Sequence, residues 1–399
     1  MQLGWIDFSE KEREKVLDVV NLLTEEGAVD ELGIGIIRDS FANLFFPGTS
    51  TIQTRAKYFL IVPYILKEVE EGKYGNRPQD ILRKIDEEER KCALKLLEND
   101  KEGVIGARVL PHRWVARSPS NIYWNGIKTL KIFNDDSLSI SEYVKLVCYL
   151  RKQKDTIKLG NRNDDAEDND RDDKDAGDVD GFSFWNLPDT YYSNWRDNLR
   201  IQLLPEEAAF LKRQIIKEHS SSLFAFILKN RIDVNKYNSF NALYESIKDS
   251  VPEELRKDMW MAYEFNRFIQ IAFTQFNLIV SAERNGRALD KWNTIKGYLK
   301  EYALIDLEAI YVRFKITNYP LRTFLNSLKS AALAEDIDKI RQIIIKRENN
   351  LKGKARAKVN RVGEFDENAW IGIEYLDYRF SDAKRIINDI YEGEAVIGV

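Results

Sequence analysis

The chain has 399 residues, of which 44% are hydrophobic and 12% aromatic, and its formal net charge is -4. This composition excludes a wholly disordered chain and allows two or three domains, each with its own core. A small net charge indicates no class of partner, so any electrostatic signal must come from where the charges lie. Cys92 and Cys148 are far apart in the sequence, which excludes a disulfide framework and a thiolate zinc site.

The longest apolar runs, such as residues 58–66, fall well short of the roughly 20 residues that span a bilayer. The first residues lack the basic and apolar regions of a secretory signal. We therefore expect a soluble, cytoplasmic protein with no membrane partner.

The N-terminal part predicts helices separated by glycine and proline. Ser9 and Glu12 have the spacing of a capping box and precede an amphipathic run that ends near Leu23. A second helix is expected over residues 36–45, where Pro47 and Gly48 follow.

Residues 46–58 combine a turn, hydroxyl side chains and cations. Ser50 and Gln53 form a second capping-box pattern, which predicts that a helix starts at Thr51. Free backbone N–H groups at a helix start attract anions, and Arg55 and Lys57 follow closely. We therefore interpret Ser50, Thr51, Arg55 and Lys57 as an anion-binding set.

The alternative for this motif is purely structural. A capped helix start is common, and Arg55 could instead pair with Asp39 or Glu31 and hold two helices together. Both interpretations bury the apolar residues 58–66 that follow.

Residues 108–131 hold five cations and no acid, interleaved with aromatic side chains. A loop is followed by a predicted helix over 120–132, an order similar to the recognition helix of a helix-turn-helix or winged-helix unit. This pattern indicates nucleic-acid contacts at Arg113, Arg117 and Lys128. The alternative is an ordinary amphipathic helix with aromatic core residues.

Residues 160–181 hold ten acidic side chains against three basic ones, which predicts a disordered linker or loop. A calcium loop and an internal mimic of nucleic acid are the alternatives. We place the predicted domains at 1–158 and 182–399, with the acidic segment 159–181 between them.

The C-terminal part predicts mostly helices, over 259–282, 289–304 and 321–350, and one alternating strand over 370–376. The expected fold class is therefore mainly α: a multi-helical, two-part protein with a small β component. The helix-turn-helix or winged-helix-like unit would lie in its N-terminal half.

Residues 339–361 carry nine cations and one acid. Such a stretch attracts a phosphate backbone with little sequence preference. We interpret Lys352, Lys354, Arg356 and Lys358 as candidate backbone contacts. A solvated basic surface, balanced by the acidic segment, is the alternative.

Few catalytic patterns are present. The chain has two histidines, and it lacks the dinucleotide, P-loop and hydrolase-elbow motifs, so no cofactor and no catalytic residue is predicted. A magnesium site of the nuclease kind remains an alternative, because carboxylates are abundant. Its candidate ligands are Asp7, Asp39, Glu374, Asp377 and Asp382.

Three segments together resemble an uncharacterised bacterial family, a domain of unknown function: residues 4–8 (Gly-Trp-Ile-Asp-Phe), residues 31–35 (Glu-Leu-Gly-Ile-Gly) and residues 46–58. The resemblance covers essentially the full chain, including residues 119–124 and residues 378–380. It implies genes near helicases, methyltransferases and phospholipase D-like proteins in antiviral defence islands, and therefore an accessory role. The family offers no catalytic residues to carry over.

The leading hypothesis is a non-catalytic nucleic-acid-binding or scaffolding component of a prokaryotic defence assembly. Its expected partners are DNA or RNA and a helicase or nuclease. A metal-dependent nuclease or phosphoryl-transfer enzyme is one alternative, and a protein–protein adaptor is the other.

Overall fold

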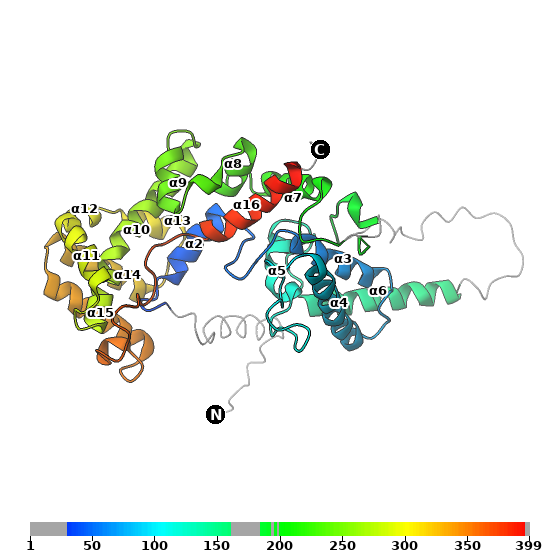
Figure 1. The fold of residues 1–399 in the computed structure, drawn as a ribbon, viewed down its shortest axis with the longest axis horizontal. Coiled ribbons are helices and arrows are strands. Elements are labelled where there is room, and N and C mark those ends of the chain that lie inside the picture. The colour runs from blue at the N-terminus through cyan, green and yellow to red at the C-terminus, as the bar shows by residue number, and fades with distance from the viewer. Residues whose placement is uncertain (1–29, 161–183, 193–194, 198, 396–399) are drawn as a thin grey trace, which may run out of the picture. The chain divides into compact units, whose positions relative to one another are not determined.

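Helices form nearly all the regular structure of the protein (Figure 1). The computed structural model describes residues 30–160, 184–192, 195–197 and 199–395, with backbone only over 154–160. Within these residues the only β pairing is an isolated antiparallel bridge between Phe133 and Trp185. The prediction of a mainly α protein is confirmed, and no described helix is long and apolar enough to cross a bilayer.

The chain divides into two units, each made of two segments. Unit 1 comprises Met1–Phe41 and Pro252–Leu376, and unit 2 comprises Ala42–Val251 and Asp377–Val399. These units do not coincide with the domains expected at 1–158 and 182–399. The acidic segment 159–181 lies outside the described residues except for its first two, as does the predicted helix over 9–23, so both stay predictions.

Unit 1 is built around one long helix. Helix α10 (Glu253–Val280) is buried over most of its C-terminal part and is flanked by α11 and α15 (Figure 1). A helix that is apolar around its circumference is stable only inside a core. The other elements of the unit are α11 (Gly286–Ile295), η4 (Lys296–Tyr298), α12 (Leu299–Tyr302), α13 (Leu307–Arg313), α14 (Tyr319–Leu333), α15 (Ile337–Lys352) and η5 (Lys358–Asn360).

Unit 2 holds the remaining helices, of which α7 and α16 lie side by side. Helix α2 (Gly35–Phe45) contains the boundary between the units, after Phe41. The elements of unit 2 are α3 (Tyr58–Glu70), α4 (Pro78–Asn99), α5 (Pro119–Thr129), α6 (Ile140–Gly160), η2 (Asp189–Tyr192), α7 (Pro205–Glu218), α8 (Leu223–Asn230), η3 (Val234–Lys236), α9 (Phe240–Ile247) and α16 (Phe380–Ala395).

Side-chain caps explain where many of these helices begin. In each case an oxygen of the residue before the helix accepts a bond from a backbone N–H of the first turn, which would otherwise lack a partner. These caps are Ser222, Ser239, Asn285, Asp306, Asn318 and Asp336.

Two predicted helix boundaries are wrong. The motif at 46–58 does not start a helix at Thr51, because residues 51–57 form turns and α3 begins at Tyr58. The run over 321–350 is two helices, because Glu335 has a positive φ of 53° and Asp336 caps α15. Apolar residues recur at helical spacing both before and after this turn, so their periodicity could not show that the helix is interrupted.

The strand predicted over residues 370–376 is also wrong. Asn277 donates to the carbonyl of Ile371 (3.0 Å) and accepts from its N–H (2.7 Å). Asn266 does the same at Leu376, at 3.0 and 3.1 Å. The segment therefore pairs with side-chain amides of α10 instead of another strand.

An aromatic cluster lies at the centre of unit 2. Trp185 Nε1 donates to the hydroxyl of Tyr143 (2.8 Å), which in turn donates to the carbonyl of Leu66 (3.0 Å). The rings of Phe133 and Phe184 stack at 5.7 Å. Residues on both sides of the acidic segment thus share one core.

Candidate functional site

The cations of the 46–58 motif are bound by carboxylates of unit 2. Arg55 Nη2 lies 2.8 Å from Asp389 of α16, and the backbone N–H of Ala56 donates to the same carboxylate at 2.6 Å. Burial raises the pKa of Asp389 above its ordinary value, although the Arg55 guanidinium opposes this shift. The motif therefore binds an anion, and that anion is the carboxylate of Asp389.

Lys57 makes an equivalent internal pair. Its ammonium lies 2.6 Å from Glu207 Oε2, and both side chains are almost completely buried. Glu207 also accepts from the N–H of Leu204 (2.8 Å) and so caps α7. Burial lowers the pKa of Lys57 despite the facing carboxylate. The charge of Lys57 is therefore compensated by an acid inside unit 2.

The hydroxyl residues of the motif are arranged differently from the prediction. Gln53 accepts from the N–H of Ser50 (3.1 Å) and donates to the carbonyl of Gly48 (3.0 Å), so it closes the turn. Ser50 Oγ has no hydrogen-bond partner among the described residues, and Thr51 is exposed. The four predicted anion-binding residues therefore share no open site.

The motif packs directly on α5, the other N-terminal candidate. The hydroxyl of Tyr123 accepts from the N–H groups of Thr54 (2.8 Å) and Arg55 (3.0 Å). Gly126 lies so close to the turn that a Cβ atom there would come within 2.3 Å of the Gly48 carbonyl oxygen. The tertiary structure thus joins two segments that the sequence suggested separately.

The start of α5 does not have the exposure of a recognition helix. The N–H of Ser120 donates to Glu89 at 2.6 Å, and burial raises the pKa of Glu89 to about 8. Lys128 donates to the carbonyls of Asp136 (3.1 Å) and Leu138 (3.4 Å). No strand pair that could form a wing occurs in the part of the chain that the structure describes.

The other two candidate contacts of this region, Arg113 and Arg117, lie exposed in the loop before α5. His112 is exposed in the same loop, whereas His219 Nε2 lies 2.9 Å from the carbonyl of Thr129. The structure therefore separates Lys128, which binds its own loop, from the two arginines.

Seven of the nine cations at 339–361 fall into two kinds, and the other two, Arg341 and Arg361, pair with Glu283 and Glu364. The first kind binds the N-terminal segment of unit 1: Lys358 Nζ lies 2.9 Å and Lys352 Nζ 3.7 Å from Glu31 Oε1. Arg347 donates to the carbonyls of Leu32 (2.8 Å) and Gly33 (3.2 Å). Two of the four predicted backbone contacts, Lys352 and Lys358, thus hold the segment at residues 31–35 in place.

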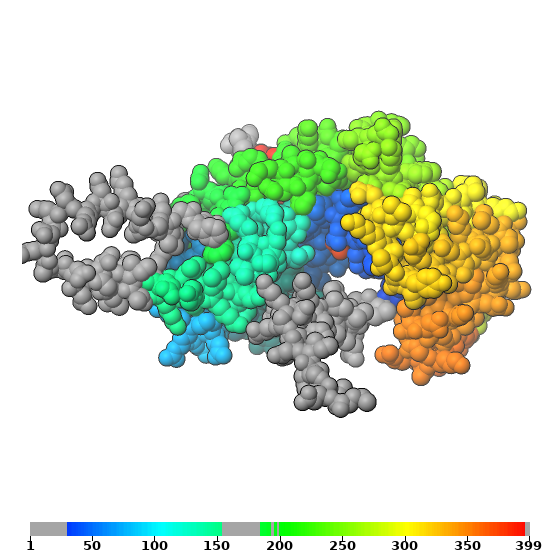
Figure 2. All heavy atoms as spheres, turned by 180° about the vertical axis from the view of Figure 1, so that it is seen from behind, coloured from blue at the N-terminus to red at the C-terminus, as the bar shows by residue number. Residues whose placement is uncertain are grey.

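The second kind points to solvent. Lys339, Lys346, Lys354 and Arg356 are exposed, and the described residues give none of them an ion pair. Arg356 Nε donates to the carbonyl of Lys352 at 3.1 Å. We define these four side chains as the exposed cation set. Figure 2 shows the segment after α15 in orange at the surface of unit 1.

A groove of about 690 Å³ runs along one face of α14, with no acid among its lining residues. Tyr319 lies at one end with 77% of its surface exposed, and Lys339 of the exposed cation set lies at the other. Between them are Arg322, Thr323, Asn326, Ser327 and Ser330. Arg322 also pairs with Glu308 at 2.8 Å, which partly neutralises it.

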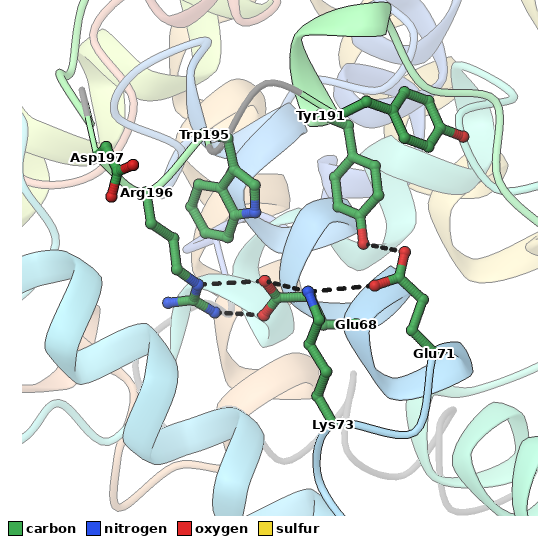
Figure 3. A pocket seen from close by; sticks show the side chains of 8 residues that line it. Glu68, Glu71, Lys73, Tyr191, Trp195, Arg196 and Asp197 are labelled. Carbon is green, nitrogen blue, oxygen red and sulfur yellow. Dashed lines mark hydrogen bonds and ion pairs between the residues drawn. The ribbon is translucent and has the colours of Figure 1, made fainter.

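A second pocket, of about 450 Å³, lies at the C-terminal end of α3 in unit 2 (Figure 3). Its buried floor is Glu68, which accepts bonds from Arg196, Tyr74 and Lys73. Burial alone raises the pKa of Glu68, but the bonds from Arg196 and Tyr74 outweigh it and leave the pKa below its ordinary value. Glu68 is therefore charged at neutral pH and fully hydrogen-bonded.

The wall of this pocket is aromatic and carries two further acids. Tyr191 donates to Glu71 at 2.6 Å, and the Arg196 guanidinium stacks over the Trp195 ring at 4.5 Å (Figure 3). Tyr192 has 72% of its surface exposed. Asp197 completes the lining. The dense aromatic run of Tyr191, Tyr192 and Trp195 is the sequence feature that indicates this pocket.

Four of the five candidate magnesium ligands already have partners within the chain. Each of the following carboxylates has its own nearby partner: Asp39 with Arg38 (3.0 Å), Glu374 with Arg287 (2.7 Å), Asp382 with Arg385 (2.6 Å) and Asp377 with the N–H of Ser381 (2.7 Å). Asp7 lies outside the described residues. Within the described ranges, no three His, Cys, Asp or Glu side chains are grouped so that they could hold a metal ion.

The fold and these sites define a mainly α-helical protein whose N-terminal motif is fixed by internal ion pairs. Residues 1–170 match the family model of a family of unknown function (DUF6361). This match confirms the resemblance to an uncharacterised family over residues 1–170, whereas the expectation that it covers the full chain stays a prediction. Searches of curated proteins and of solved structures gave no match.

Proposed function

We propose that this protein binds nucleic acid through unit 1 without catalysing a reaction on it. The observation that carries the proposal is the exposed cation set, Lys339, Lys346, Lys354 and Arg356, which has no carboxylate partners among the described residues. Cations that are free to release their counterions to a phosphate backbone supply most of the sequence-independent affinity for nucleic acid.

The α14 groove supports a single strand as the preferred form. An exposed tyrosine offers a face on which a base can stack, and hydroxyl and amide side chains can bond to sugar and phosphate. Lys339 belongs both to this groove and to the exposed cation set. The groove and the cations therefore act on the same ligand.

The test measures binding of fluorescein-labelled DNA and RNA, single-stranded and duplex, over a sodium chloride series. Replacing all four cations of the exposed set by Gln should lower affinity at low salt and reduce the slope of log K against log salt by about 0.7 per lost single-strand contact. Absence of binding at low salt in the natural protein contradicts the proposal.

A matched control carries the same change of charge at four exposed lysines that pair with neighbouring acids: Lys84, Lys236, Lys248 and Lys257. Replacing these by Gln should leave the salt slope almost unchanged. An equal loss in both variants would assign the binding to net charge and not to this surface.

The stacking role has a separate test. Tyr319→Ala should weaken single-strand binding by about 1–3 kcal/mol, the value of one base stacked on an aromatic ring, and should leave duplex binding nearly unchanged. Equal effects on both forms would argue against a base stacked on Tyr319.

The accessory role in antiviral defence rests on the family resemblance alone and stays a prediction. A cytoplasmic location agrees with this proposal and with the free cysteines Cys92 and Cys148. The adaptor alternative would be favoured if a helicase or nuclease co-purified with this protein while the protein alone bound no nucleic acid.

A further inference from the structure

We propose that the pocket at the end of α3 binds the alkylammonium group of a small amine, and that the side chain of Lys73 occupies the ammonium position when the pocket is empty. The pocket is lined by Glu68, Glu71, Lys73, Tyr191, Tyr192, Trp195, Arg196 and Asp197. This inference concerns unit 2 and is independent of nucleic-acid binding by unit 1.

The charges of the pocket favour a cationic ligand. Three carboxylates line it, from Glu68, Glu71 and Asp197, against the two cations Lys73 and Arg196. The pocket is therefore net negative as it stands, and an added phosphate or carboxylate would face a surplus of like charge.

The hydrogen bonds already made by the pocket side chains indicate the same class of ligand. Arg196 already directs Nε at Glu68 (3.2 Å) and Nη1 at Glu88 (3.0 Å). The hydroxyl of Tyr191 is used by Glu71. Most donors are thus engaged, whereas Asp197, an exposed residue at the edge of the pocket, has no side-chain partner among the described residues. A ligand with several N–H donors can bond to the carboxylate acceptors that remain.

Aromatic faces add to this preference. Tyr192 is largely exposed, Tyr191 stands beside Glu71 in Figure 3, and Trp195 already carries the Arg196 guanidinium over its ring at 4.5 Å. An ammonium group is attracted to the face of Tyr or Trp, and the attraction increases where water is displaced. Aromatic rings beside acids are therefore suited to alkylammonium ligands.

Lys73 shows where such a group can bind. Its Nζ lies 3.3 Å from Glu68 Oε1 and 3.2 Å from Glu71 Oε2, between the two carboxylates (Figure 3). The side chain is 52% exposed and leaves the chain from the turn after α3, so it can swing into solvent. A ligand ammonium could take the same position and restore both ion pairs.

The experiment is calorimetric titration of the full chain at low salt in an amine-free buffer. The probes are spermidine, for free polyamines, and Nα-acetyl-lysine methylamide, for a lysine side chain. Lys73→Met removes the internal competitor and should raise affinity for whichever probe binds by about fivefold, the fold-change of one partly exposed ion pair. Asp197→Asn and Trp195→Leu should each lower it by a similar factor.

The control is Lys248→Met, which removes an exposed lysine that pairs with Glu245 in the same unit. It should leave the titration unchanged, and the melting temperature of every variant verifies folding. The proposal is overturned if neither probe binds the natural chain or Lys73→Met. It is also overturned if adenosine monophosphate binds instead and Lys73→Met abolishes that binding.

Discussion

At the scale of single residues, the chain places charges in buried positions and pairs them across long sequence distances. Asp389 and Glu207 come from helices far from the 46–58 motif, and each faces one of its cations. The two cations were visible in the sequence. Their partners were not, because an acid among 65 acidic residues carries no sign of which cation it will meet.

The Arg55–Asp389 pair should be important for stability. Asp389→Asn leaves a half-buried guanidinium without its counter-charge, and we expect a loss of about 2–3 kcal/mol in the free energy of unfolding. Urea denaturation measures it. Glu245→Gln, at an exposed pair with Lys248, is the control and should cost less than about 0.5 kcal/mol.

Glu89 should make stability depend on pH. Burial raises its pKa from the ordinary 4.5 to about 8, so the folded state holds this proton more tightly than the unfolded state. Its contribution to stability is complete below about pH 4.5 and is lost as the pH rises towards 8.

Glu89→Gln keeps the shape and cannot ionise. The variant should therefore be more stable than the natural protein at pH 9, by on the order of 1 kcal/mol or more, and nearly equal at pH 5. Urea unfolding at the two pH values is the measurement. An equal effect at both would show that Glu89 does not change its charge in this range.

At the scale of elements, two side chains of α10 make the backbone hydrogen bonds that a neighbouring strand would otherwise make. Two asparagines bind both backbone groups of Ile371 and Leu376, so the segment at 370–376 depends on the helix and not on a sheet. Alternation predicts a strand from the sequence alone, and it cannot show that helix side chains supply the partners of the backbone groups.

Asn277→Ala should release one end of this segment. It removes two partly buried hydrogen bonds to Ile371 and leaves the backbone groups of that residue unpaired, at a cost of about 2–4 kcal/mol. Hydrogen exchange should show faster exchange of the Ile371 N–H. If that N–H keeps its protection, the amide pairing is not what holds the segment.

Gly126 tests the contact between α5 and the motif. Helix propensity alone favours Gly126→Ala by about 1 kcal/mol. A Cβ atom would however lie 2.3 Å from the Gly48 oxygen and 2.8 Å from Phe59, so we expect a net loss of about 2–4 kcal/mol in thermal or urea unfolding. Gly297→Ala, where nothing lies within 4 Å, should be close to neutral.

At the scale of the whole molecule, each unit is completed by a distant part of the chain. Leu32, Ile34, Ile37 and Phe41 are fully buried in unit 1, and the Phe41 ring lies 4.6 Å from that of Phe314. Fragments 1–181 and 182–399 therefore each lack part of a core. Expressed alone, neither should show the near-ultraviolet dichroism of fixed aromatic packing, and co-expression should restore it.

The amino-acid sequence by itself determined the helical fold class, most helix positions, the family resemblance and the stretches where cations gather. These follow from local periodicity, capping residues and composition, which act within a few turns of chain. Only the tertiary structure decided what each cation does. Arg55, Lys57, Lys352 and Lys358 meet internal carboxylates, whereas Lys354 and Arg356 stay exposed, because charges pair through space between segments up to 334 residues apart.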